Sequence, residues 1–313
     1  MNKYIFFLII LVIALSFSSC SKEPDINNAT MLDGDVIFDP SISNPELYLV
    51  SKALPDPTPE QLNTPVIIAS HGYSASTFEW DEFRTYADEK GGLLISQVLL
   101  GGHGTTYEDF KNSTWENWKP PIMEEYRALR DKGYTNINFA GSSTSCLLTL
   151  SLIKSGDFEE NGLRNIFFVD PIVIPSDKLL TIIGFVGPML GYFETDMTAG
   201  EEGYWYHFRP QETLKQLMKV IDIVRKDLQK GFKLPVGAKL KVYKSIQDPS
   251  ADPAGAVLIY KGLKSSDGSP ITVEMLDSDL HVVTRLAGRE GVTQKDRDMQ
   301  THVFDDMYQL LTD

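Results

Sequence analysis

Short apolar segments alternate with segments of helical periodicity from Pro65 to the end of the chain, and this alternation limits the possible folds more than any other feature. The apolar segments have the length and composition of buried strands, and glycine turns separate most of them from the helical segments. The expected strands cover residues 66–69, 93–100, 136–140, 165–169, 239–244 and 271–275, and the expected helices cover residues 78–90, 115–132, 144–155, 254–263 and 296–311. Strands joined by helices of this length predict an α/β fold with a mainly parallel sheet and helices on both of its faces.

Residues 172–235 interrupt this alternation, because two helical patterns follow each other there without a strand between them. The first pattern, at residues 177–192, is unusually apolar, and the second, at residues 211–230, has one apolar face. Ligands of open α/β sheets bind beyond the carboxyl ends of the strands. We therefore expect the insertion to cover that edge of the sheet as a helical lid.

A serine stands at the junction between the third expected strand and the helix that follows it. Ser143 comes two residues after Gly141, and Ser145 occupies the position at which such turns usually have a second glycine. A turn this sharp holds a nucleophile in a strained backbone conformation, so its neighbours must be small. The pattern G-x-S-x-S therefore predicts Ser143 as a nucleophile, and a serine-rich turn that only caps the helix is the alternative.

A serine hydroxyl becomes a strong nucleophile only when a base takes its proton and a carboxylate orients that base. His281 is the predicted base, because it follows the last expected strand near the end of the chain. Asp248 is the predicted acid, because it follows the strand at residues 239–244, and Asp170, which also ends a strand, competes with it. The order Ser143, Asp248, His281 along the chain is that of the α/β hydrolases.

The oxyanion formed in such an attack needs N–H donors that are already in place. The backbone amide of Thr144 directly follows the predicted nucleophile at the start of a helix, and it is one expected donor. The amide of Tyr73, in the turn His71-Gly72-Tyr73, is the other. We expect His71 to brace this turn by hydrogen bonding rather than to react.

Five short motifs in this order resemble the monoacylglycerol lipase and carboxylesterase branch of the α/β hydrolases, which is sometimes grouped with the serine aminopeptidases. The resemblance runs from about Pro65 to the end of the chain and rests on His71-Gly72-Tyr73, Gly102-His103-Gly104 followed by Trp115 and Trp118, Gly141-Ser142-Ser143, Gln247-Asp248 and Ser278-Asp279-Leu280-His281. It implies the α/β-hydrolase fold, a helical lid, and hydrolysis of a small-molecule carboxylic ester or acylglycerol through an acyl-enzyme. It also implies a reaction without a metal or a cofactor, and a structural role for His103.

Other functions remain open on these residues. A peptidase, a thioesterase or an acyltransferase uses the same three side chains, so the motifs do not distinguish these activities from ester hydrolysis. Ser145 departs from the family pattern. That departure supports a second hypothesis, in which the chain is a surface-anchored binding lipoprotein that keeps the fold with little or no catalysis.

The first residues predict export and lipid attachment. Lys3 precedes an apolar run at residues 4–15 that is too short to span a bilayer as a helix but has the length of a signal-peptide core. Serine-rich residues then lead to Cys20. Small residues followed by a cysteine resemble the lipobox of bacterial lipoproteins, in which the cysteine is diacylated and the peptide is cut just before it. The expected segments are a signal peptide at residues 1–19, a lipidated tether at residues 20–44 and an α/β-hydrolase domain at residues 45–313, with the lid at about residues 172–235.

Composition and cysteine content indicate the surroundings of the chain. Lipid on Cys20 would attach the chain to a membrane of the cell envelope, at the outer membrane or the cell surface. Cys146 would then have no partner within the chain, and we expect it to be a small buried residue near a helix start. The net charge of −14 argues against a nucleic-acid partner, because phosphate binding needs clustered lysine and arginine side chains.

Overall fold

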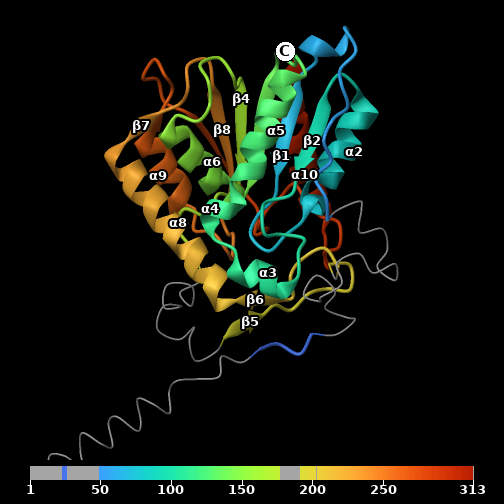
Figure 1. Ribbon diagram of the computed structural model, residues 1–313, viewed down its shortest axis with the longest axis vertical. Helices are drawn as coiled ribbons and strands as arrows, with labels where there is room; N and C mark the ends of the chain where they lie inside the picture. Colours follow the sequence, from blue (N-terminus) through green and yellow to red (C-terminus); the bar gives the residue numbers. More distant parts are fainter. Residues whose placement is uncertain (1–22, 27–48, 177–190, 202, 313) are drawn as a thin grey trace, which may run out of the picture.

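In the computed structural model, a six-stranded parallel sheet runs through the molecule in the order β10-β8-β4-β3-β1-β2 (Figure 1). Both β1 and β3 are buried along their whole length, which explains why apolar runs rather than alternating patterns encode them. The predicted parallel sheet is confirmed. Its strands are β1 (Val66–Ser70), β2 (Leu94–Val98), β3 (Ile137–Ser142), β4 (Asn165–Val169), β8 (Lys239–Ser245) and β10 (Thr272–Leu276).

The structure describes residues 23–26, 49–176, 191–201 and 203–312. The expected signal peptide, Cys20, most of the expected tether and nearly all of the expected helix at residues 177–192 lie outside these ranges. Within them, no helix combines the length and the apolar character that crossing a membrane requires.

Helices cover both faces of the sheet, as predicted (Figure 1). Helices α2 (Asp81–Lys90) and α10 (Gln294–Thr312) lie on one face, and α5 (Pro120–Asp131), α6 (Thr144–Ser155) and α9 (Ala254–Gly262) lie on the other. Neighbouring residues of β1 alternate between the two faces, so that Ile67 joins one buried apolar cluster and Ile68 joins the other. The sheet is therefore the shared wall of two hydrophobic cores.

A further group of elements lies beyond the carboxyl ends of the strands, at the lower end of the molecule in Figure 1. It contains α3 (Tyr107–Asn112), α4 (Trp115–Trp118) and a hairpin of β5 (Tyr192–Glu194) and β6 (Phe208–Pro210). The predicted amphipathic helix, α8 (Gln211–Lys230), follows the hairpin directly and packs its apolar face against α6 and α9.

The structure differs from the predicted elements mainly where they are short. The expected helix at residues 115–132 is two helices, because Pro120 starts α5 at a position where its missing N–H is not needed. Helix α3 and the β5–β6 hairpin were not predicted. Cys146 is fully buried near the start of α6, as expected. The remaining short elements are η3 (Gln61–Asn63), η4 (Thr77–Trp80), β7 (Phe232–Lys233) and β9 (Leu263–Lys264).

Candidate active site

Ser143 lies between β3 and α6 in a backbone conformation that few residues other than glycine adopt. Its φ is 49° and its ψ is −110°, which lies outside the regions that suit an L-residue. The strand before it is buried throughout, and so are the first ten residues of the helix after it. The packed surroundings therefore hold the strained turn in place.

Ser145 replaces the second glycine of the turn and adds hydrogen bonds to it. The Ser145 hydroxyl accepts a hydrogen bond from the Ser142 amide at 2.9 Å and donates one to the Ser70 carbonyl at 2.8 Å. A Cβ atom on Gly141 would lie 2.5 Å from the Ser145 hydroxyl oxygen, so glycine at position 141 makes room for serine at position 145. The departure from the usual pattern thus ties the turn to β1.

His281 and Asp248 meet Ser143 at the carboxyl edge of the sheet. The Ser143 hydroxyl lies 2.9 Å from Nε2 of His281, and Nδ1 of His281 lies 2.8 Å from a carboxylate oxygen of Asp248. In a neutral imidazole with this geometry, Nδ1–H donates to Asp248 and Nε2 accepts from the serine hydroxyl. The structure therefore brings together the three residues that the sequence grouped as nucleophile, base and acid.

Asp170, the competing acid, lies close to this group and is engaged by other donors. Its carboxylate accepts hydrogen bonds from the amides of Ser245 at 2.8 Å and Val282 at 2.9 Å. Lys244, which is fully buried, donates to Asp170 at 3.0 Å and to Asp248 at 2.5 Å. Two buried carboxylates thus share one ammonium group.

The surroundings of Asp248 keep its carboxylate ionised. Burial raises the pKa of this group, but the hydrogen bond and charge of His281 and the charge of Lys244 outweigh burial and hold the pKa at about 2. The amides of Ser250 and Ala251 donate to its second oxygen at 2.8 and 3.0 Å. An ionised Asp248 holds His281 in one tautomer at neutral pH.

The loop that carries His281 is held from two sides. Val282 has a φ of 61°, which is rare for a β-branched residue, and Asp170 accepts hydrogen bonds from the amides of Val282 and Val283. On the other side, the Arg289 guanidinium donates to the His281 carbonyl. These contacts fix the imidazole position independently of any ligand.

The turn after β1 lies directly against Ser143. A Cβ atom on Gly72 would lie 3.1 Å from the Cβ of Ser143, so glycine permits this close approach. The Gly72 amide donates to the buried carboxylate of Glu79 at 2.8 Å, and the Ser142 hydroxyl donates to the same oxygen. Glu79 therefore joins this turn to the turn that holds the serine.

Two buried histidines brace the turn after β1, as was expected of His71. Nε2 of His71 accepts from the Leu100 amide at 3.0 Å, and its Nδ1 donates to the carbonyl of the next residue at 2.8 Å. His103 likewise accepts from the Ser74 amide at 3.1 Å and donates to a backbone carbonyl at 3.2 Å. Each ring needs one protonated and one free nitrogen, and burial lowers the pKa of His71 to about 4 and that of His103 well below its ordinary value.

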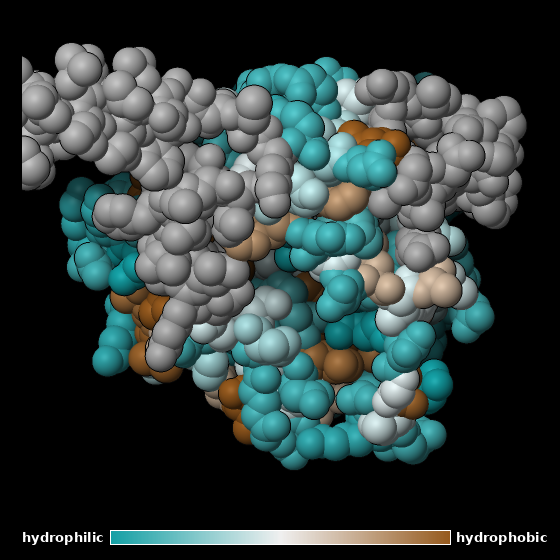
Figure 2. Space-filling model, turned by 90° about the horizontal axis from the view of Figure 1, so that it is seen from below, coloured by the Kyte–Doolittle hydropathy of each residue, from teal (hydrophilic) through white to brown (hydrophobic). Residues whose placement is uncertain are grey.

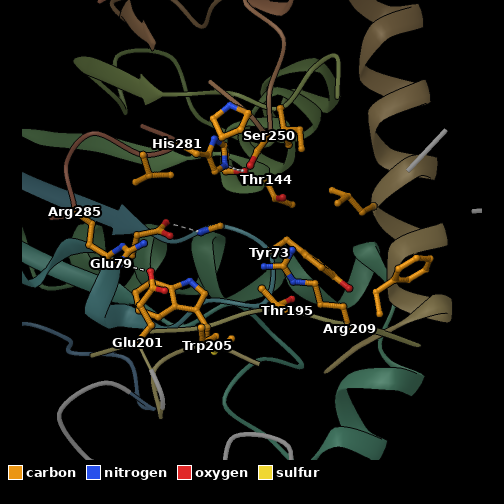
Figure 3. Close-up of a pocket in the computed structure, with 18 of the residues that line it drawn as sticks. Tyr73, Glu79, Thr144, Thr195, Glu201, Trp205, Arg209, Ser250, His281 and Arg285 are labelled. Atoms are coloured by element: carbon orange, nitrogen blue, oxygen red, sulfur yellow. Dashed lines mark hydrogen bonds and ion pairs between the residues drawn. The ribbon is translucent and has the colours of Figure 1, made fainter. Parts of the chain in front are cut away.

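A cavity of about 550 Å³ opens beside Ser143 (Figure 3). Tyr73 and Thr144, whose amides are the predicted oxyanion donors, line it together with Ser143 and His281. Figure 2 looks onto this edge of the molecule, where hydrophilic side chains surround a recess. Residues between 193 and 217 supply much of the lining. The described part of the insertion therefore covers the carboxyl edge of the sheet, and its movement as a lid stays a prediction.

Several charged residues at the site were not singled out in the sequence, among them Lys244, Glu79 and Arg209. Lys244 ends the expected strand at residues 239–244 and precedes the predicted acid by four residues. This spacing is the one local signal of an ion pair. Glu79 and Arg209 gave no local signal, because their positions depend on contacts between distant segments. Within the described residues, no group of three or more histidine, cysteine, aspartate or glutamate side chains is placed to hold a metal ion.

Replacing Ser145 tests whether its hydrogen bonds hold the turn. Ser145→Ala leaves the Ser142 amide without its buried acceptor, so we expect the free energy of unfolding to fall by about 1–3 kcal/mol in urea denaturation. Ser145→Gly, which restores the commoner residue, should cost at least as much, because glycine also weakens the helix. Ser155→Ala, at the exposed end of α6, should change the free energy by less than about 0.5 kcal/mol. Equal stability of the Ser145 variants and the parent chain would contradict this role.

The neutral state of His71 predicts loss of stability in acid. Its pKa is about 4 in the folded chain and about 6.5 in the unfolded chain, so the unfolded state binds more protons between these values. The contribution of neutral His71 to the free energy of unfolding is therefore complete above about pH 6.5 and declines as the pH falls towards 4. His71 alone should lower the free energy of unfolding by about 2 kcal/mol between pH 7 and pH 5. In urea denaturation, His71→Gln should flatten this slope, whereas Ser155→Ala, which removes no titratable group, should leave it steep; equal slopes would refute the assignment.

A curated relative and many solved structures are similar to the chain, although no protein-family model matches it. The relative is a thermostable monoacylglycerol lipase from Bacillus sp. (strain H-257), which is 24% identical over 229 residues that cover 71% of this chain and 85% of the lipase.

The solved structures agree with the observed topology. A structure from the work on LipS and LipT, two metagenome-derived lipolytic enzymes, superposes with a TM-score of 0.62 and 18% identity over 80% of this chain and 94% of that one. A soluble variant of monoglyceride lipase from Saccharomyces cerevisiae has a TM-score of 0.62 and 12% identity, over 83% of this chain and 89% of its own. Together with the parallel sheet and the strained serine turn, these likenesses show that the chain has the α/β-hydrolase fold.

Proposed function

We propose that the chain is a serine hydrolase that cleaves carboxylic esters through an acyl-enzyme on Ser143. One observation carries the proposal: Ser143, His281 and Asp248 form a continuous hydrogen-bonded series, at 2.9 and 2.8 Å, at the wall of a cavity. This series places a nucleophile, a base and an orienting acid in the spatial order that acyl transfer needs.

Acylation begins when Oγ of Ser143 attacks the carbonyl carbon of the ester. Nε2 of His281 takes the hydroxyl proton, and the ionised Asp248 stabilises the imidazolium that forms. The same Nε2–H then protonates the alcohol oxygen as its bond to the carbonyl carbon breaks. Because all three side chains are held in place beforehand, little reorganisation opposes the attack.

The attack places negative charge on the carbonyl oxygen, and N–H donors must stabilise this charge. We assign this role to the backbone amides of Tyr73 and Thr144. Thr144 is the first residue of α6, so its amide lies at the positive end of the helix dipole. Tyr73 follows the glycine that packs against Ser143. A water molecule, deprotonated by His281, then attacks the acyl carbon, releases the carboxylic acid and restores the serine.

The proposed substrates are small esters with short to medium acyl chains, including monoacylglycerols. The similarity to a monoacylglycerol lipase supports this class. Apolar side chains of Ile172, Leu214 and Leu217 line part of the cavity and offer a surface for an acyl chain. Peptides and thioesters pass through the same steps, and a substrate series separates these activities from ester hydrolysis.

An activity-based probe tests the nucleophile. The chain without its first 44 residues should react with a fluorophosphonate, and Ser143→Ala should lose this labelling and at least about 10³-fold in kcat/KM on 4-nitrophenyl esters. Ser155→Ala is the control, and it should label like the parent chain. Failure of the folded parent chain to label would favour the non-catalytic binding lipoprotein. A series of acyl chain lengths then measures the size of the acyl pocket.

We also propose that Cys20 carries the lipid that attaches the chain to a membrane of the cell envelope. The support is the apolar run and the serine-rich approach to this cysteine. When the full chain is produced in bacteria supplied with labelled palmitate, the label should appear on the chain and the chain should sediment with membranes. Cys20→Ser should lose both properties, and Cys146→Ser should keep them. Label retained by Cys20→Ser would refute the assignment.

A further inference from the structure

Three arginine side chains line the cavity beside Ser143: Arg209 in β6, and Arg285 and Arg289 in the segment after His281. Within the part of the chain that the structure describes, the Nε–H group of each one is buried and has no hydrogen-bond partner. Buried cationic donors without acceptors cost free energy, which an anion in the cavity would recover.

Two of these arginines already form an ion pair or a hydrogen bond with other groups of the protein. Arg285 forms an ion pair with Glu201 at 2.8 Å and lies over the Trp205 ring at 4.3 Å. Arg289 donates to the His281 carbonyl. Burial and the charge of Arg285 lower the pKa of Arg289 to about 10, and the charges of Glu201 and Glu79 offset only part of this. Both arginines therefore have roles in holding the loops around the cavity.

Arg209 differs, because among the described residues its guanidinium has neither an ion-paired carboxylate nor a hydrogen-bond acceptor. Its guanidinium lies over the ring of Tyr73, 6.0 Å from the ring centroid. Figure 3 shows this group directed into the cavity between Tyr73 and Thr195. Burial lowers the pKa of Arg209, but a guanidinium stays protonated at any physiological pH. The guanidinium therefore faces the substrate space without a directly bound counter-charge, although the charge of Glu201 attracts it from beyond ion-pair distance.

The remaining acidic residues of the lining do not neutralise this cation. Glu194 pairs with His207 at 2.8 Å and is itself exposed, as is Asp196. Screening by solvent makes such exposed carboxylates weak partners for a group inside the cavity. Neither exposed carboxylate therefore prevents the Arg209 guanidinium from binding an anionic group inside the cavity.

We propose that Arg209 binds a carboxylate carried by the ester substrate, so that the site prefers anionic esters to neutral ones of the same size. This inference rests on the proposed function and narrows its substrate class. A planar guanidinium with a free Nε–H matches a carboxylate with two parallel hydrogen bonds. Neutral monoacylglycerols then rank below esters whose acyl or alcohol part ends in a carboxylate.

Two matched pairs of esters test this preference and locate the carboxylate. The acyl pair is 4-nitrophenyl hydrogen glutarate and 4-nitrophenyl pentanoate, and the alcohol pair is 3-acetoxybenzoate and 3-acetoxybenzamide. In at least one pair, the parent chain should show a kcat/KM ratio of anionic to neutral ester of about 10 or more, the effect of one charge-assisted contact. Arg209→Met should lower that ratio about 10- to 100-fold. Arg225→Met, on α8 and outside the residues that line the cavity, should keep it.

The outcomes separate this inference from the proposed function. Ratios near one for both pairs in the parent chain, or an unchanged ratio in Arg209→Met, would overturn the role of Arg209 while neutral esters are still hydrolysed. Loss of all hydrolysis and of fluorophosphonate labelling in the folded parent chain would instead overturn the proposed function. If Arg209→Met does not fold, Arg209→Lys keeps the charge without the planar fork, and its ratio should fall at least about threefold.

Discussion

A buried lysine between two aspartates holds the carboxyl edge of the sheet together. Lys244 lies near the end of β8, Asp170 follows β4, and Asp248 stands four residues beyond the lysine. Charges removed from water are tolerated only in close pairs, and removal of one partner leaves the others uncompensated. Because Asp170 also binds the loop that carries His281, the position of the imidazole depends on this ion network. The geometry of the proposed catalytic series is therefore a consequence of buried electrostatics.

Several residues with strained backbone conformations lie at the same edge of the sheet. Ser74, Ser143, Asp170 and Val282 all have positive φ values, and all follow strands at their carboxyl ends or lie in the histidine loop. Each such conformation costs free energy of order 1–3 kcal/mol and persists only in well-packed surroundings. The two apolar clusters on either face of the sheet supply that packing. The strands and helices are regular, and the loops that they hold are not.

The proposed chemistry and the proposed selectivity come from different parts of the chain. The serine, the acid and the histidine follow strands of the parallel sheet. The β5–β6 hairpin and α8 add Trp205, Arg209 and Leu214 to the cavity. A fold can host many reactions because the residues around its site change while its scaffold does not. In this chain the insertion supplies the arginine proposed to select the substrate.

The sequence by itself determined the sheet, most of the helices, and the serine and histidine that meet at its edge, and it offered two candidates for the acid. Unbroken apolar runs define buried strands, and Gly141 before Ser143 marks a sharp turn, so local patterns sufficed for both. Only the tertiary structure decided which acid faces His281, since Asp248 lies 2.8 Å from the imidazole whereas Asp170 accepts hydrogen bonds from backbone amides of distant segments. It also decided where Arg209 lies, because pairing of β6 with β5 places it in the cavity. The physical reason is that backbone preference is local, whereas the partners of buried charges come from segments distant in sequence.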